Sequence, residues 1–369
     1  MLPSSSRNIA CRLTGQASYA RVINMLKTLK KDIDKSLLVL IKKMEKSSDL
    51  KANSPLLYAG IKDFLKRPGK RIRPILFLVG YLGYTKRKNF SYKKLLESSL
   101  SIELLHDFML MHDDVIDKSD LRRGKPTLHK VFNKKAGVSS GNELGESLSI
   151  VAGDVVFAMA VQALFTFDEK SDRKERALAK FTETAATTGI GEFIDVVNGS
   201  KTIEKVTECD VLSTYTLKTA KYTFEAPLVM GAILAGADKK ELAKLSKLGI
   251  MLGQAFQIQD DLLDIFSTSE ETGKPVLSDL AEGKKTLLLW QAYKTLPSRD
   301  KKTIRELLSK KKRTRGDLLK LRDLIKESGS DEYCVKKIRS IHTKAERIMR
   351  DLNMDKKYKC VLSEFLNKI

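Results

Sequence analysis

Apolar residues recur along this chain mostly at steps of three and four, which is the spacing of one face of an α-helix. No run of alternating apolar and polar residues is bounded by turn dipeptides, so the pattern predicts no β-sheet. The longest predicted helices cover residues 23–44, 92–117, 143–167, 175–197, 207–230 and 239–266. We therefore expect an all-α fold.

Polar segments with glycine or proline separate these helices. No tandem repeat is present, and a chain of 369 residues can form one large domain. We expect that domain over residues 26–369. The expected breaks are Pro68-Gly69, Gly124-Lys125-Pro126, residues 134–142, Asn198-Gly199, Gly273-Lys274-Pro275 and the basic connector 309–316.

The first 25 residues differ from the rest of the chain. No acidic residue occurs before Asp32, and Arg7, Arg12 and Arg21 lie in a tract that contains serines. A disordered extension explains this composition and predicts a cytoplasmic protein. An organellar transit peptide is the alternative, whereas the apolar stretch of a secretory signal is missing.

Composition excludes several classes of protein. Hydrophobic residues make up 42% of the chain, which rules out global disorder. The four cysteines form no CxxC pair, so a zinc ribbon or a disulfide framework is not expected. The most apolar stretch, residues 149–167, is interrupted by Asp154 and Gln162. A buried helix of a soluble protein explains it better than a membrane span does.

Most of the net charge of +22 lies in residues 1–50 and 291–369. Basic ends suit phosphate-bearing substrates, an anionic membrane surface or nucleic acid. Aromatic residues do not interleave the basic C-terminal segment, so we expect no nucleic-acid partner. Peripheral membrane contact stays open as a hypothesis.

Two acidic pentads, each near the end of a predicted helix, are the main chemical signal. Residues 113–117 and 260–264 both read DDxxD. On a helix the first and last aspartates of such a pentad share a face, and the second is turned about 100° away. Carboxylates beside apolar stripes need cations, and oxygen ligands beside phosphates suit Mg²⁺. The pentads comprise Asp113, Asp114, Asp117, Asp260, Asp261 and Asp264.

Basic residues surround these acidic pentads in the sequence. Arginine forks and lysine ammonium groups are suited to diphosphate oxygens. No P-loop, no dinucleotide-binding glycine motif and no HExxH motif is present. The basic groups are Lys70, Arg71, Arg73, Arg122, Arg123, Lys218, Lys274, Lys284 and Lys285.

Together these motifs resemble the trans-isoprenyl diphosphate synthases, or polyprenyl synthetases. The matching segments occur in family order between residues 69 and 286. They are GKRIRP (69–74), ELLHDFMLMHDDVIDKSDLRRGKPTLH (103–129), LGESLSIVAGDVVF (144–157), GEFID (191–195), KTA (218–220), FQIQDDLLDI (256–265) and GKPVLSDLAEGKKT (273–286).

The resemblance implies antiparallel helices around a deep central cavity, in a homodimer. It implies Mg²⁺-dependent, head-to-tail transfer of a prenyl group from an allylic diphosphate (dimethylallyl, geranyl or farnesyl) to isopentenyl diphosphate. It also implies three Mg²⁺ ions per site. Glu192 stands where the family has Gln in a Gln-x-x-Asp pair with Asp195, which adds a charge there.

The resemblance assigns roles position by position. Asp113, Asp117 and Asp260 are the implied Mg²⁺ ligands, with Asp114, Asp261 and Asp264 in support. The implied ligands of the allylic diphosphate are Arg122, Lys218 (also implied in catalysis), Thr219, Gln257, Lys274 and Lys284. Those of isopentenyl diphosphate are Lys70, Arg73, His106 and Arg123.

Product length is predicted from the helix that carries the first pentad. Phe108 and Met109 lie about one turn before Asp113 on that helix, so a bulky Phe108 is expected to form the floor of the product tunnel. In the family, an aromatic residue there suggests short products, and the pentad lacks an insertion. The chain is most similar to archaeal-type geranylgeranyl diphosphate synthases, which predicts C20, with C15 as the alternative.

Other interpretations fit less well. A terpene cyclase shares the helical architecture but does not bind isopentenyl diphosphate, so it does not explain GKRIRP and RRG. A non-catalytic partner subunit of a heteromeric synthase often loses an acidic motif, whereas both are intact here.

Overall fold

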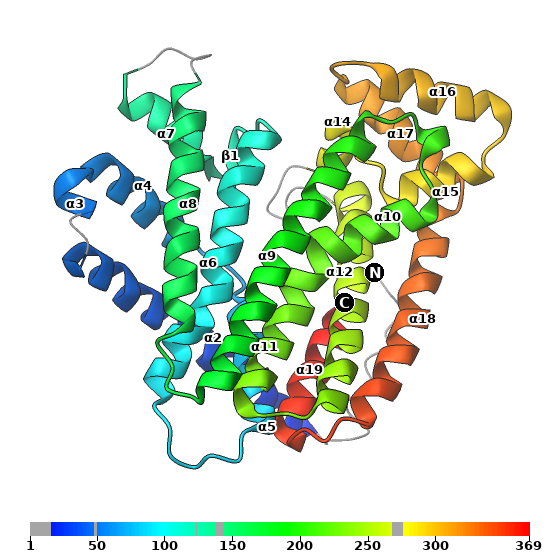
Figure 1. Ribbon diagram of the computed structural model, residues 1–369. Coiled ribbons are helices and arrows are strands. Elements are labelled where there is room, and N and C mark those ends of the chain that lie inside the picture. The colour runs from blue at the N-terminus through cyan, green and yellow to red at the C-terminus, as the bar shows by residue number, and fades with distance from the viewer. Residues whose placement is uncertain (1–15, 48–49, 123, 138–142, 268–275) are drawn as a thin grey trace. The chain divides into compact units, whose positions relative to one another are not determined.

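The computed structural model describes residues 16–47, 50–122, 124–137, 143–267 and 276–369 (Figure 1). Within these residues the chain is helical almost throughout, and one short hairpin is the only sheet, so the all-α prediction is confirmed. The chain divides into two compact units. Unit 1 comprises Met1–Thr182, Ala226–Leu242 and Asn353–Asn367; unit 2 comprises Glu183–Glu225, Ala243–Leu352 and Lys368–Ile369.

Unit 1 holds the elements around the first acidic pentad. They are α2 (Gln16–Ser47), α3 (Leu50–Asn53), α4 (Pro55–Leu65), α5 (Ile72–Tyr84), α6 (Tyr92–Ile116), β1 (Leu121–Arg122), β2 (Lys125–Pro126), α7 (Leu128–Lys135), α8 (Leu144–Leu164), α11 (Ala226–Ala235) and nearly all of α19 (Lys356–Lys368).

Unit 2 holds the elements around the second pentad, and the boundary between the units falls within α9 (Ser171–Ser200) and α12 (Lys239–Phe266). The other elements of unit 2 are η2 (Ile203–Lys205), α10 (Glu208–Thr214), η3 (Tyr215–Glu225), α14 (Ser278–Glu282), α15 (Leu287–Thr295), α16 (Ser298–Ser309), α17 (Arg315–Glu327) and α18 (Ser330–Arg350).

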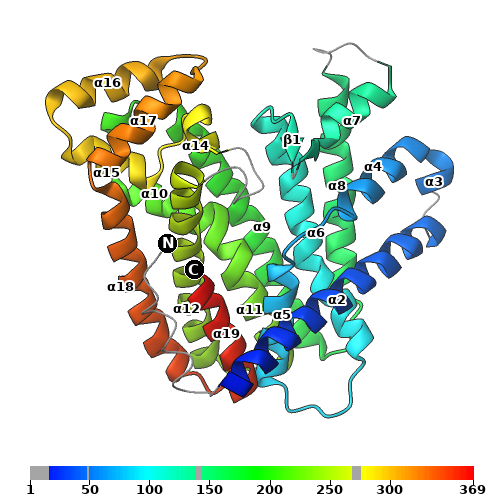
Figure 2. The same ribbon diagram turned by 180° about the vertical axis from the view of Figure 1, so that it is seen from behind.

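The core of unit 1 forms around α6, which packs along α8, while α2 crosses α5 and α6 on the other side (Figures 1 and 2). The stripe of Leu96, Leu100 and Leu104 is buried, as the periodicity predicts. Helices α5 and α11 approach each other closely, because a Cβ atom on Gly80 would lie only 2.3 Å from the carbonyl oxygen of Leu228. Helix α6, which carries the first pentad, thus packs against α8, α5 and α2 within unit 1.

Two helices of unit 1 differ from the expectation. Helix α2 begins at Gln16 rather than near residue 23, and Val22, one residue before the predicted start, is buried. Helix α8 is long and apolar enough to cross a membrane, but it is only partly buried: the face with Ala152, Val156 and Ala160 is buried in unit 1, and the opposite face is exposed. Its outer face exposes Ile150 and Val151 beside the charged Asp154.

One predicted helix of residues 207–230 is present as three consecutive segments, α10, η3 and α11. The capping box of Thr207 and Asp210 starts α10. The middle segment, η3, is a π-helix, a rare form that occurs often at functional sites. The segment therefore carries its side chains at a different angular spacing from the rest of the helix.

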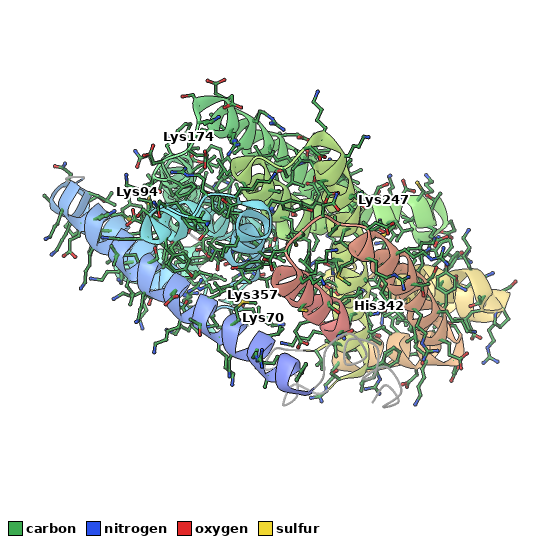
Figure 3. The ribbon with its side chains drawn as sticks, turned by 90° about the horizontal axis from the view of Figure 1, so that it is seen from below. Lys70, Lys94, Lys174, Lys247, His342 and Lys357 are labelled. Carbon is green, nitrogen blue, oxygen red and sulfur yellow. The ribbon has the colours of Figure 1, made fainter. Side chains whose placement is uncertain are left out.

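Much of the positive charge lies on helix surfaces. The exposed lysines Lys94, Lys247 and Lys357 lie on helices, and Lys70 lies just before α5 (Figure 3). Such side chains give a solvated, basic surface, so the net charge alone does not identify a ligand.

Candidate active site

The first acidic pentad lies at the C-terminal end of α6. Asp113 and Asp117 are half-buried, and carboxylate oxygens of the two lie within 4.8 Å of each other. The helix ends at Ile116, and Lys118 then turns the chain through a positive φ of 53°. The two aspartates therefore present adjacent oxygen ligands on one face, as the spacing of four predicts.

Asp114 points into the protein and pairs with the arginine that follows on β1. Arg122 donates from Nε to Asp114 over 2.5 Å and from Nη2 to Asp113 over 2.9 Å. Burial raises the pKa of Asp114 to about 6, although Arg122 opposes the shift. Arg122 thus holds the acidic pentad in place, and its contact with diphosphate stays a prediction. Arg123 lies outside the described residues.

The GKRIRP segment enters α5 through a buried ion pair. Arg71, with a positive φ of 53°, donates to Glu103 over 2.7 Å and to Asp34 over 2.8 Å. Its neighbours Lys70 and Arg73 are exposed and half-buried, respectively. Arg71 is therefore a structural residue that fixes the start of α5, while Lys70 and Arg73 flank it. His106, another predicted substrate ligand, is buried on α6.

An aromatic column lies below the first pentad. The ring centroid of Phe108 lies 4.6 Å from that of His112 and 5.2 Å from that of Phe157 on α8. The ring centroids of Phe157 and Phe181 are 6.0 Å apart. Gly153 permits this approach, since a Cβ there would lie 2.5 Å from the His112 ring. Phe108 and its neighbour Met109 are half-buried.

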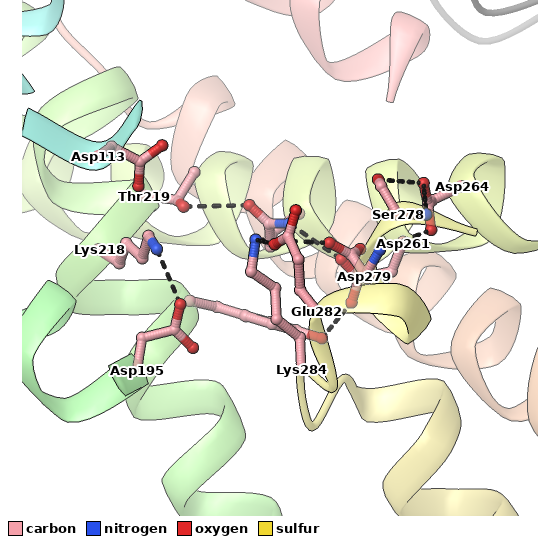
Figure 4. A network of polar contacts seen from close by, with 12 residues as sticks. Asp113, Asp195, Lys218, Thr219, Asp261, Asp264, Ser278, Asp279, Glu282 and Lys284 are labelled. Atoms are coloured by element: carbon pink, nitrogen blue, oxygen red, sulfur yellow. Dashed lines mark hydrogen bonds and ion pairs between the residues drawn. The ribbon is translucent and has the colours of Figure 1, made fainter. Parts of the chain in front are cut away.

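The second pentad lies at the C-terminal end of α12. Asp260 is exposed, Asp261 is buried and Asp264 is half-buried. Asp264 accepts hydrogen bonds at the N-terminus of α14 from the backbone amide of Ser278 over 3.1 Å and from its hydroxyl over 2.7 Å (Figure 4). Asp264 therefore anchors the segment that follows the pentad rather than standing free for a metal ion.

Asp279 brings a further carboxylate to this cluster. Burial, together with the negative charge of the neighbouring aspartates, raises the pKa values of Asp261 and Asp279. Lys284 opposes the shift at Asp279 and pairs with Glu282 over 2.5 Å (Figure 4). Such a concentration of carboxylates is stabilised by cations. Lys274 lies outside the described residues.

The KTA segment lies on η3 and faces two neighbouring helices of unit 2. Lys218 pairs with both Glu192 and Asp195 of α9, each over 2.8 Å. The replacement of the family's Gln by Glu192 therefore gives this lysine a second carboxylate. A Cβ on Gly191 would lie 2.4 Å from the amide nitrogen of Lys218, so glycine allows the two backbones to meet.

Thr219 connects η3 to α12. Its hydroxyl donates to Oε1 of Gln257 over 3.0 Å, and Nε2 of Gln257 donates to Asp261 over 2.9 Å (Figure 4). Three residues that the resemblance placed in one site are thus joined by hydrogen bonds within unit 2.

The donor set fits Mg²⁺. Asp113 and Asp117 offer adjacent oxygens in unit 1, and Asp260 offers an exposed carboxylate in unit 2. All three groups are carboxylates, and hard oxygen ligands of this kind are what Mg²⁺ binds beside phosphate groups.

Two features of the site were not assigned from the sequence. Asp279 belongs to the segment 273–286 that carried the resemblance, but its burial beside Asp261 depends on the fold. Phe157 and Phe181 lie far from Phe108 in the sequence, so only the packing of α6, α8 and α9 brings the rings together.

Comparison with known sequences gives an independent line of evidence. A family model described as polyprenyl synthetase matches residues 54–325. A short chain isoprenyl diphosphate synthase of Methanocaldococcus jannaschii is 33% identical over 288 residues, covering 77% of this chain and 78% of the relative. A geranylfarnesyl diphosphate synthase of Aeropyrum pernix is 31% identical, covering 77% and 84% of the two chains.

Solved structures of prenyl diphosphate synthases also match this chain. The geranylgeranyl pyrophosphate synthase of Corynebacterium glutamicum, complexed with isoprenyl diphosphate and magnesium, matches with a TM-score of 0.85 and 26% identity. The match covers 92% of this chain and 98% of that one. The fold is thus shared over nearly the whole length of the two chains.

Proposed function

The chain belongs to the polyprenyl synthetase family and is a prenyltransferase, and on this basis we propose that it makes C20 geranylgeranyl diphosphate. The observation that supports this product is Phe108, half-buried one turn before Asp113 in the aromatic column of unit 1. The named relatives include synthases of both geranylgeranyl and geranylfarnesyl diphosphate. C15 farnesyl diphosphate is the shorter alternative.

Asp113, Asp117 and Asp260 would hold Mg²⁺, for which we propose three ions per site. Bound Mg²⁺ stabilises the negative charge that develops on a departing diphosphate. Asp114, Asp261 and Asp264 orient the elements that carry these ligands, through Arg122, Gln257 and Ser278.

The side chains of the chain itself bind and orient the allylic diphosphate. Lys218, Lys284 and Arg122 supply fixed positive charge, and Thr219 and Gln257 supply polar groups; Lys274 is assigned the same task. Fixed cations favour breakage of the allylic C–O bond because they stabilise the leaving group more in the transition state than in the ground state.

Isopentenyl diphosphate is assigned to Lys70, Arg73, His106 and Arg123. Its double bond attacks the allylic carbon, a C–C bond forms, and a proton leaves the adjacent carbon. The released diphosphate can accept that proton, so the reaction needs no dedicated side-chain base. The residues that bind the two substrates therefore act mainly by positioning.

A starter series tests the proposed chain length. Purified protein with Mg²⁺ and labelled isopentenyl diphosphate is given C5, C10 or C15 allylic diphosphate, and the dephosphorylated products are separated by length. We expect all three starters to converge on C20. Accumulation of C15 from the shorter starters would support the farnesyl alternative, and accumulation of C25 or longer would refute Phe108 as the floor.

We also propose a homodimer assembled through the outer face of α8. That face exposes Ile150 and Val151 over a helix of high hydropathy, and a second copy would cover it. Sedimentation should give twice the 41.5 kDa of the chain. Val151→Lys should shift the protein toward monomer, whereas Leu38→Lys, at an exposed apolar position on α2, should not. Equal behaviour of both variants would contradict this interface.

We propose a cytoplasmic location, with peripheral contact between the basic surface and anionic membranes. Binding to vesicles of anionic lipid at low salt, lost as salt rises, would support the contact.

A further inference from the structure

The buried side chain of Tyr215 joins three segments of unit 2 that carry predicted substrate ligands. Its hydroxyl donates to Oδ2 of Asp261 on α12 and accepts from the backbone amide of Leu287 over 2.8 Å. Leu287 is the first residue of α15 and directly follows the Lys284-Lys285-Thr286 segment. The hydroxyl group of Tyr215 on η3 thus bonds both α12 and the start of α15.

Tyr215 also closes a ring of hydrogen bonds. Tyr215 and Thr219 are four residues apart on η3, and Asp261 and Gln257 are four residues apart on α12. Tyr215 binds Asp261, Asp261 accepts from Gln257, and Gln257 accepts from Thr219. The relative register of η3 and α12 is therefore set by two polar contacts, one on each side of Lys218.

The surroundings leave these contacts little freedom. A Cβ on Gly253 of α12 would lie 2.3 Å from the Cα of Ala220, so the two helices touch by their backbones. Tyr215 is 6% exposed, and Asp261 is 2% exposed. A buried carboxylate without its hydroxyl donor would be poorly compensated, so the tyrosine hydroxyl is hard to replace by water.

We propose that Tyr215 is a positioning residue for the allylic diphosphate. Its hydroxyl holds the second acidic pentad, the Lys218-Thr219 pair and the segment that carries Lys284 in one register, without touching the substrate. This inference rests on the proposed function, because it assumes that the predicted ligands in unit 2 bind the allylic diphosphate. Nothing in the residue's own position requires a contact with isopentenyl diphosphate, whose predicted ligands lie in unit 1.

Tyr215→Phe removes the hydroxyl and keeps the ring. We expect the KM for allylic diphosphate, and the Kd for inorganic diphosphate with Mg²⁺ measured by calorimetry, to rise about 10-fold to 100-fold. The KM for isopentenyl diphosphate should change little. A residue that only stabilises the fold would lower the amount of active protein and leave both KM values unchanged.

Tyr333→Phe is the matched control. Tyr333 also lies in unit 2 and donates to a carboxylate, that of Glu208 over 2.7 Å, and the ammonium group of Lys337 lies over its ring. Neither partner is a predicted substrate ligand. Its variant should keep the wild-type KM values and Kd. If Tyr215→Phe and Tyr333→Phe behave alike, the inference is wrong; if the wild-type protein elongates no starter, the proposed function itself fails.

A second variant covers the case in which Tyr215→Phe does not fold. Leu287→Pro removes the amide that donates to the hydroxyl and puts the proline Cδ in the place of the amide hydrogen, so the Tyr215 hydroxyl has to move away from its 2.8 Å contact. Proline is well accepted at the first position of a helix, and circular dichroism checks that the loss of the buried Leu287 side chain leaves the fold intact. The preceding Thr286 has ψ of 164°, which suits a residue before proline. We expect the same selective rise in the allylic KM, and a change confined to the KM for isopentenyl diphosphate would overturn the inference.

Discussion

Replacement of Asp113 by alanine should lower the turnover of prenyl elongation by at least about 100-fold, the effect of losing one preorganised group that stabilises transition-state charge. Asp113 presents its carboxylate beside that of Asp117, and both are predicted to bind Mg²⁺. The loss should fall mainly on kcat, because the charge it helps to neutralise grows as the diphosphate departs.

The fold of the Asp113→Ala variant should remain intact. Asp113 is half-buried, and Arg122 keeps its second partner, the buried Asp114. Circular dichroism should therefore match the wild-type helical spectrum. Asp323→Ala, which removes an exposed carboxylate from α17, serves as the control and should keep full activity. Near-normal turnover of Asp113→Ala would refute the role of the first pentad in binding Mg²⁺.

Replacement of Phe108 by alanine should lengthen the product beyond C20. The ring packs between His112 and Phe157, so its removal opens space along α6 on the side away from Asp113. A growing prenyl chain would enter that space, because burial of each added CH₂ contributes about 0.8 kcal/mol. Products of C25 and longer should appear at the expense of C20 when the reaction is resolved by chain length.

Phe165→Ala provides the comparison for Phe108→Ala. Phe165 also belongs to unit 1, at the C-terminal end of α8, but it is 45% exposed and outside the aromatic column. Its variant should give the wild-type product. Identical product spectra from both variants would mean that Phe108 packs the core without limiting chain length, and Phe157 would become the next candidate.

The helical fold could be predicted from hydrophobic spacing because nearly every helix has an apolar stripe. The predicted helix of residues 239–266 coincides with α12, and that of residues 92–117 ends one residue beyond α6. The π-helical form of η3 could not be predicted, since apolar residues at steps of three and four fit an α-helix equally well. The altered spacing matters because Tyr215, Lys218 and Thr219 lie on this segment.

The acidic motifs could also be recognised in the sequence, but the sequence did not show which aspartates present ligand oxygens and which hold neighbouring elements in place. Asp113 and Asp117 share a face, as their spacing requires, while Asp264 is used to hold α14. Which carboxylate faces solvent depends on the residues packed against it. Arg71 shows the same limit, since it lies between Lys70 and Arg73 in the motif and yet forms a buried ion pair.

The family resemblance and the structure contributed different information. The motifs from GKRIRP to GKKT predicted the chemistry, which family membership now supports. Tyr215 had no such motif, because its importance comes from a hydroxyl that reaches Asp261 and Leu287 across long stretches of sequence. Contacts of this kind are set by tertiary packing and are invisible to periodicity.

The most direct test of the proposed chemistry is a single condensation reaction with and without divalent cation. Wild-type protein is mixed with labelled isopentenyl diphosphate and farnesyl diphosphate, and both the allylic product and released diphosphate are measured. We predict one diphosphate released for each C20 product formed, with both abolished by EDTA and restored by Mg²⁺. Absence of any elongated product, or elongation that persists in EDTA, would contradict Mg²⁺-dependent prenyl transfer by this protein.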